Sequence, residues 1–111
     1  KEISIPATVT SIGNSAFGAC INLIKAEIPN TIATLPDNLF YQCFELVDVN
    51  IPTSTTSIGS SVFYGCTSLE NINMPDNITN IGGSAFGNCA NLRSISIPDG
   101  LTTIEETTFF N

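Results

Sequence analysis

A short pattern returns every 23 residues through the whole chain, and it constrains the fold more than any other feature. It begins with a leucine, continues with alternating polar and apolar residues and ends at a proline. Its copies occupy residues 23–29, 46–52, 69–75 and 92–98, and residues 1–6 form a partial copy. Self-similarity at a fixed period of this length is typical of proteins whose repeats stack on one another.

Positions one period apart form columns of nearly constant identity. The columns hold proline at 6, 29, 52, 75 and 98, phenylalanine at 17, 40, 63, 86 and 109, cysteine at 20, 43, 66 and 89, and leucine at 23, 46, 69 and 92. Equivalent residues become neighbours in adjacent coils of a stacked array, where a coil is one 23-residue turn of the chain. We expect these columns to form a continuous interior, because one repeat alone buries too little surface to fold.

Each coil contains one strand of about four to six residues, indicated by the alternation before the proline. In the first full copy this strand is centred on residues 25–28, with Leu23, Ala26 and Ile28 facing inward. The proline ends the strand because it has no amide proton to donate to a ladder.

Two further elements complete the coil. A second extended piece, such as residues 9–12, precedes a glycine that we expect to turn the chain through positive φ; these glycines are Gly13, Gly59 and Gly82. A single helical turn follows, as at residues 15–20. The N-caps that we expect for successive turns are Asn14, Asp37 and Ser60.

The full repeat resembles that of BspA-like leucine-rich repeat proteins, which are bacterial and protozoan surface proteins. The matching text includes residues 58–69 (IGSSVFYGCTSL) and 81–92 (IGGSAFGNCANL), and the resemblance covers the whole chain. It implies an α/β repeat fold: a right-handed β-α superhelical solenoid with a parallel strand ladder on its concave face and short helical turns opposite. It also implies a cell-surface or extracellular location, adhesion or host-protein binding, and no catalytic residues.

We expect a single leucine-rich repeat domain over residues 1–111. Its five approximate coils are residues 1–22, 23–45, 46–68, 69–91 and 92–111. Because the chain begins and ends inside a repeat, we also expect it to be a fragment of a longer array.

Composition excludes several classes of function. The net charge is −7, and the three cations are Lys1, Lys25 and Arg93, so no basic stripe can neutralise nucleic-acid phosphates or anionic lipid. No apolar run approaches 18 residues, so we predict no membrane insertion. The chain has no histidine, which excludes Ser-His-Asp and Cys-His catalysis. We predict that it is not an enzyme and has no cofactor.

The four cysteines predict buried free thiols. Stacked side chains that point the same way do not readily give the torsions of a disulfide, although an even count keeps a disulfide framework open as the alternative. A metal site lacks support from histidine or CxxC spacing. Asp76 and Asp99 are stacked carboxylates, but they occupy only two coils, and we predict no metal.

Residues that alternate with the inward strand positions form two polar columns. The first holds Glu2, Lys25, Asp48, Asn71 and Ser94, and the second holds Ser4, Glu27, Asn50, Asn73 and Ser96. The candidate ligand-binding residues are Lys25, Glu27, Asp48, Asn50, Asn71, Asn73, Ser94 and Ser96. The alternative is a solvated sheet face, on which Lys25 and Asp48 pair only to support the register.

A second candidate contact face is aromatic and lies on the side of the predicted helical turns. Its members are Tyr41, Phe44 and Tyr64, since exposed tyrosines can anchor a partner. In the alternative, Tyr41 simply packs on Tyr64 across the coil boundary. The column that contains these tyrosines reads Gly18, Tyr41, Tyr64, Gly87 and Phe110.

These observations favour a non-catalytic binding module that presents its concave strand face to an extracellular protein or glycan. The alternative is a structural solenoid whose copies associate end to end into rods or filaments. The first reading follows from a fixed interior and a variable exterior, whereas the alternative follows from uncapped ends and identical coil geometry.

Overall fold

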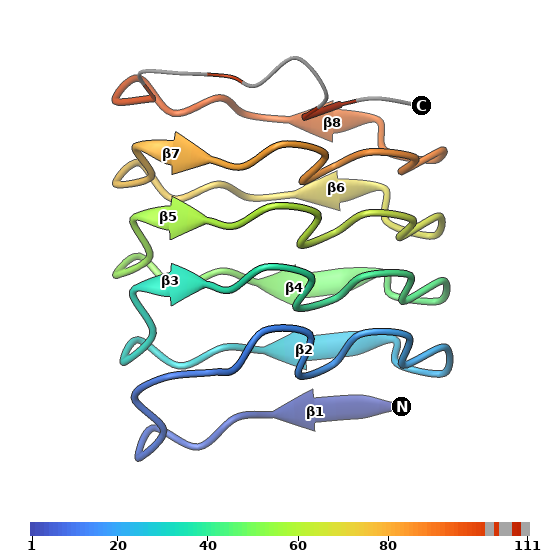
Figure 1. Cartoon of the computed structure of the whole chain (residues 1–111), viewed down its shortest axis with the longest axis horizontal. Coiled ribbons are helices and arrows are strands. Elements are labelled where there is room, and N and C mark those ends of the chain that lie inside the picture. Colours follow the sequence, from blue (N-terminus) through green and yellow to red (C-terminus); the bar gives the residue numbers. More distant parts are fainter. Residues whose placement is uncertain (102–103, 105–107, 110–111) are drawn as a thin grey trace.

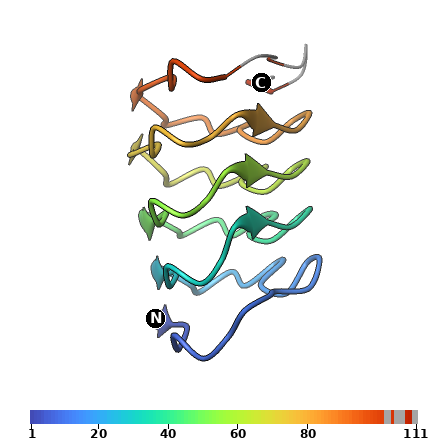
Figure 2. The same ribbon diagram turned by 90° about the vertical axis from the view of Figure 1, so that its left-hand side faces the viewer.

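The chain forms a stack of coils with short strands in two columns, seen here in a computed structural model (Figure 1). The structure describes residues 1–101, 104 and 108–109. The first column comprises β1 (Glu2–Ser4), β2 (Lys25–Glu27), β4 (Asp48–Asn50), β6 (Asn71–Ile72) and β8 (Ser94–Ile95). The second comprises β3 (Thr34–Leu35), β5 (Ser57–Ile58) and β7 (Asn80–Ile81). Figure 2 shows the two columns on opposite sides of the stack.

Strand pairing is parallel, and its register equals the sequence period. Glu2 lies opposite Lys25, which in turn lies opposite Asp48. In the second column Ser57 lies opposite Asn80. The prediction of a parallel ladder built by the 23-residue repeat is therefore confirmed, although the strands are two or three residues long, shorter than expected.

The first column is divided into two sheets. Strands β1, β2 and β4 form one sheet, and β6 and β8 form the other. Strands β4 and β6 still contact each other across this division. The division lies between Asn50 and Asn71, near the middle of the stack.

The interior follows the predicted columns. The phenylalanine rings stack from Phe17 through Phe40, Phe63 and Phe86 to Phe109, with centroid separations of 5.9, 5.7, 5.3 and 5.6 Å. Leu23, Ala26 and Ile28 are all buried, as expected from the alternation. Each coil thus supplies one layer of a continuous core.

The predicted helical turns are wrong, because the described residues contain no helix. In the first coil Gly18 donates to the Ser15 carbonyl over 2.9 Å, a β-turn bond, whereas the neighbouring Phe17 and Ala19 amides donate to the next coil over 3.1 and 2.7 Å. A helix directs every amide along its own axis. Here alternate amides serve a ladder between coils, and Ser15 and Ala19 adopt left-handed φ values of 60° and 57°, which a right-handed helix excludes.

The N-cap roles predicted for Asn14, Asp37 and Ser60 are also wrong, because these residues precede no helix. The Asp37 carboxylate instead accepts a hydrogen bond of 2.8 Å from the Ser60 backbone amide in the next coil. The side chain therefore ties two coils together.

The expectation of positive φ at Gly13, Gly59 and Gly82 is also wrong. The left-handed residues lie later in each turn, at Ser15, Asn38, Ser61 and Ser84 and at Ala19, Gln42, Gly65 and Asn88. Glycine is needed at 82 for a different reason: a Cβ there would lie 2.6 Å from the Ser60 backbone nitrogen. The adjacent coil approaches too closely for any side chain.

Candidate ligand-binding surfaces

The first candidate surface is the strand face, defined as the outward side of β1, β2, β4, β6 and β8. Inward residues such as Ala26, Val49 and Ile72 are buried. The outward residues on either side of them are exposed, or half-buried in the case of Lys25; they are Lys25, Glu27, Asp48, Asn50, Asn71, Asn73, Ser94 and Ser96. The structure therefore places all eight predicted candidates together on one face.

The end of the strand face nearest the N-terminus is acidic. Lys25 Nζ lies 3.8 Å from Asp48 Oδ2 and 3.9 Å from Glu27 Oε1, so the predicted pairing of Lys25 with Asp48 is confirmed. Side-chain exposures of 40–63% leave these contacts open to solvent screening. Among the outward side chains at this end, the carboxylates of Glu2, Glu27 and Asp48 outnumber one cation, Lys25, so the outward side has excess negative charge.

The centre of the strand face carries amides and its far end carries hydroxyls. Asn50 and Asn71 flank the division between the two sheets, and Asn73 follows β6. Ser94 and Ser96 lie one coil further on. Amide side chains both donate and accept hydrogen bonds, so the centre can bind neutral polar groups.

An apolar margin beside the acidic end was missed by sequence reasoning. Ile24 and Val47 are 43% and 48% exposed, and the Val47 amide donates to the Ile24 carbonyl over 2.8 Å. The equivalent residues in later coils are Glu70 and Arg93. The sequence did indicate this margin, because Ile24 and Val47 are apolar at a repeat position whose residue type is not conserved between coils.

The second candidate surface lies on the side of the β-turns. The Tyr41 and Tyr64 rings stack with centroids 5.3 Å apart and planes 11° apart, which confirms the packing alternative. Phe44 is 43% exposed, and among the described residues no ring contact joins it to these tyrosines. Phe110, the last member of the tyrosine column, lies outside the described residues.

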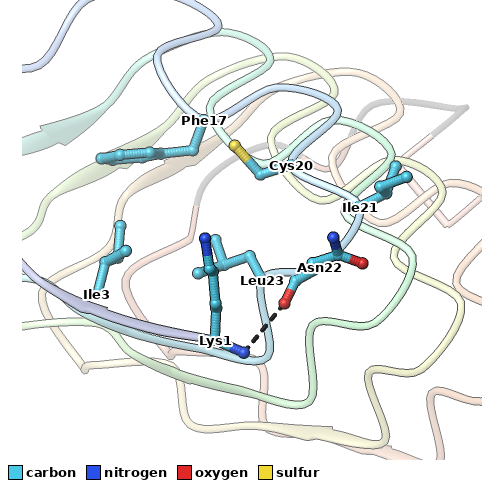
Figure 3. Close-up of a pocket in the computed structure, with 7 residues that line it drawn as sticks. All are labelled: Lys1, Ile3, Phe17, Cys20, Ile21, Asn22 and Leu23. Atoms are coloured by element: carbon cyan, nitrogen blue, oxygen red, sulfur yellow. Dashed lines mark hydrogen bonds between the residues drawn. The ribbon is translucent and has the colours of Figure 1, made fainter.

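A hollow of about 250 Å³ lies at the end of the stack where the chain begins (Figure 3). Its apolar lining includes Ile3, Phe17, Cys20 and Leu23. The N-terminal ammonium of Lys1 donates to the Asn22 carbonyl over 3.1 Å at its rim. In later coils, the residues equivalent to these are each covered by the preceding coil.

The sequence matches the family model described as the BspA type leucine-rich repeat region over residues 1–111, as six copies. The chain belongs to the BspA-type leucine-rich repeat family. No curated protein matches the sequence. Among solved structures, a leucine-rich cell surface protein of Faecalibacterium prausnitzii is 34% identical with a TM-score of 0.96, covering 99% of this chain and 29% of that one.

Two more distant structures share the fold of this BspA-type chain. A leucine-rich repeat protein of T. pallidum gives a TM-score of 0.87 at 22% identity, over 91% of this chain and 50% of its own. The pneumococcal vaccine antigen PcpA gives 0.83 at 22% identity, over 89% of this chain and 24% of its own. The chain thus spans half or less of the length of the structures it matches.

The thiols of this BspA-type array are free, as predicted, and three are buried. Cys43, Cys66 and Cys89 each donate to the carbonyl of the phenylalanine in the preceding coil, at 3.1, 3.2 and 3.1 Å. Burial raises the pKa of Cys43 and of Cys89 to about 11 and raises the pKa of Cys66 still further. A nucleophilic cysteine needs the opposite environment.

The described residues contain no cluster of three or more His, Cys, Asp or Glu side chains placed to hold a metal ion. Asp76 and Asp99 are both exposed. The described part of the chain also has no helix that could cross a bilayer.

Proposed function

We propose that this chain is a non-catalytic binding module of a cell-surface or secreted protein, and that its strand face, predicted to be concave, holds an extracellular protein or glycan. The location is supported by the F. prausnitzii relative, which is described as a cell surface protein. Relatives share the fold along almost the whole chain, so the frame is common to them and the outward side chains are where they can differ.

The observation that carries the proposal is the contrast between adjacent columns of one strand. Ala26, Val49 and Ile72 are alike in character and buried. Their outward neighbours Lys25 and Asp48 differ in charge and remain in contact with solvent. Constant inward residues hold the backbone rigid, so the outward residues can vary without loss of the fold.

A binding role suits the chemistry of the strand face better than catalysis. Along the described part of the strand face, carboxylates, amides and hydroxyls are spread from coil to coil and are not gathered at one point, as acid or base work would require. The protein has no histidine, and its net charge of −7 opposes nucleic acid. Affinity would arise from many modest contacts on a preformed surface.

Alanine substitution of the central amides tests the proposal. Asn50→Ala, Asn71→Ala and Asn73→Ala are combined in one variant, and binding is measured to immobilised collagen, immobilised laminin and an array of neutral glycans. We expect at least about tenfold weaker binding with a thermal midpoint within about 2 °C of the parent.

The matched control combines Asn14→Ala, Asn30→Ala and Asn80→Ala, which removes three exposed amides elsewhere. It should bind like the parent. Unchanged affinity in the strand-face variant, or no binding of the parent to any surface, contradicts the proposal.

End-to-end association is the second candidate, favoured by the constant 23-residue register of the coils, with which a second copy could continue the strand ladder. Light scattering after size exclusion should then show a mass that rises with concentration, and Ile3→Glu should abolish the rise by placing a charge in the hollow. A monomer at all concentrations rejects this candidate.

A further inference from the structure

The outer aromatic column is interrupted beside Tyr41. The first coil has Gly18 where the second and third coils have Tyr41 and Tyr64. The missing side chain leaves a notch of about 480 Å³, within the roughly 300–1,000 Å³ range of small-molecule sites. The notch is lined by Ser15, Gly18, Ala19, Asn38, Tyr41 and Gln42.

One face of the Tyr41 ring is available in this notch. Its other face stacks on Tyr64, with the ring planes 11° apart. Since the rings stack along the axis of the coils, the free face is directed toward the layer of Gly18. Ring centroids one coil apart are 5.3–5.9 Å apart throughout this molecule, so the notch has room for one flat ring at stacking distance.

Two amide side chains line the same notch as the free face. Asn38 and Gln42 are half-buried at the notch, and neither side chain has a hydrogen-bond partner among the described residues. Each amide can donate and accept. An aromatic platform with a few polar groups at its edge is a typical arrangement for a small-molecule site.

We propose that the notch is a binding site for a neutral pyranose sugar with equatorial hydroxyls, such as a β-glucoside. The axial C–H groups of such a ring form an apolar face that packs on the electron-rich face of Tyr41. The hydroxyls at the ring edge then meet the amides of Asn38 and Gln42. A purely aromatic ligand would leave these amides unpaired, and the net charge of −7 opposes acidic sugars.

This site lies on the β-turn side and is independent of the strand face. Tyr41 and Tyr64 are the two tyrosines of the protein, and there is no tryptophan. Tyrosine fluorescence therefore reports directly on the stack beside the notch.

The test is a titration of tyrosine emission with methyl β-glucopyranoside up to roughly 50 mM. We expect a saturable change with half-saturation in the millimolar range, as befits a single small ring. Sorbitol has hydroxyls but no ring and should cause no saturable change. Toluene, an aromatic ligand without a hydrogen-bonding group, should not compete with the sugar.

Two variants locate the site. Gly18→Phe fills the notch with a ring, as the aromatic residues already do elsewhere in this column, and should weaken the response at least about tenfold. Asn38→Ser combined with Gln42→Gly copies residues used at the same positions in other coils, Ser61 and Gly65, which share the left-handed φ. This double variant keeps the fold and should also lose most of the sugar response.

The strand-face variant with three alanines should respond to the sugar like the parent. The proposal is overturned if the parent shows no saturable response, if sorbitol reproduces it, or if toluene displaces the sugar. It is equally overturned if the Asn38→Ser/Gln42→Gly variant responds normally, or if the strand-face variant alone loses the response. None of these results bears on binding to collagen or laminin.

Discussion

Two aromatic columns run along this solenoid, and they differ in continuity. The inner column has a phenylalanine in every coil, from Phe17 to Phe109, each ring stacked on the next. The outer column has Tyr41 and Tyr64 stacked with the same geometry, but glycine replaces the ring in the first and fourth coils. The same β-turn bond forms with glycine or tyrosine at this position: Gly18 donates to the Ser15 carbonyl over 2.9 Å, and Tyr41 donates to the Asn38 carbonyl over 3.1 Å.

The difference shows what each column requires. A gap in the inner column would be a cavity, since water cannot fill an apolar void without partners. A gap in the outer column is filled by solvent, or by a ligand. The inside therefore repeats because every layer must be filled, whereas the outside is free to differ between coils.

The largest expected effect comes from truncating one ring in each column and comparing the two losses of stability. Phe63→Ala should lower the free energy of unfolding by about 3–5 kcal/mol, because Phe63 is fully buried between two rings. Tyr64→Ala, one residue away, should cost roughly 1 kcal/mol, since the ring is half-buried and has one stacking partner. Urea unfolding measures both, and similar losses would contradict the distinction.

Thiol reactivity separates the inner column of cysteines from its partly exposed end. Cys20 is half-buried, whereas Cys43, Cys66 and Cys89 are buried. A thiol whose pKa is about 11 has at least about 100-fold less thiolate at pH 8 than an ordinary one. An aromatic disulfide reagent should therefore modify one thiol per native chain rapidly and the other three much more slowly.

Stability should depend on pH for the same reason. The folded pKa of Cys43 and Cys89, about 11, lies above the value of 9.0 for an exposed thiol. Between these values the unfolded chain loses the proton first, so the stability conferred below about pH 9 is lost as the pH rises toward 11. The thermal midpoint should fall between pH 8.5 and roughly 10.5, and replacing both thiols with alanine should reduce that slope.

A glycine pair tests whether close coil contact, rather than turn geometry, selects glycine. Gly82→Ala should cost about 1–3 kcal/mol because its Cβ would lie 2.6 Å from the backbone of the adjacent coil. Gly13→Ala, in the same column, meets nothing within 4 Å and should change stability by less than about 0.5 kcal/mol. Equal losses of stability would mean that backbone conformation, and not close contact between coils, selects glycine in this column.

The sequence was sufficient to predict the inside of this molecule. Constant spacing of Phe40 and Phe63, or of Cys43 and Cys66, can be satisfied only if adjacent repeats touch, and each pair proved to be stacked or buried in successive layers. The outward columns followed from the alternation along each strand. Ligand binding by these outward columns remains a prediction, because a polar ladder has the same sequence pattern whether or not it binds a ligand.

The turns could not be predicted in the same way. Residues 15–20 have the composition of a helical turn, but whether the Phe17 amide bonds within its own coil or to Leu39 depends on the adjacent coil. The role of Gly82 has the same origin, since only the neighbouring backbone makes a side chain impossible there. Local patterns show local preferences, and these features arise between coils.

The smallest expected effect concerns the outward side of the strands. Lys25→Met keeps the apolar stem and removes the contacts of 3.8 and 3.9 Å to Asp48 and Glu27, so it should cost roughly 0.2–1 kcal/mol in urea unfolding at low salt. The loss should largely vanish in 0.5 M NaCl, where the Debye length falls to about 4 Å. A loss well above about 1 kcal/mol that persists in salt would mean that Lys25 is part of the fold. In that case the strand face could not vary freely, and the reason for assigning recognition to it would be lost.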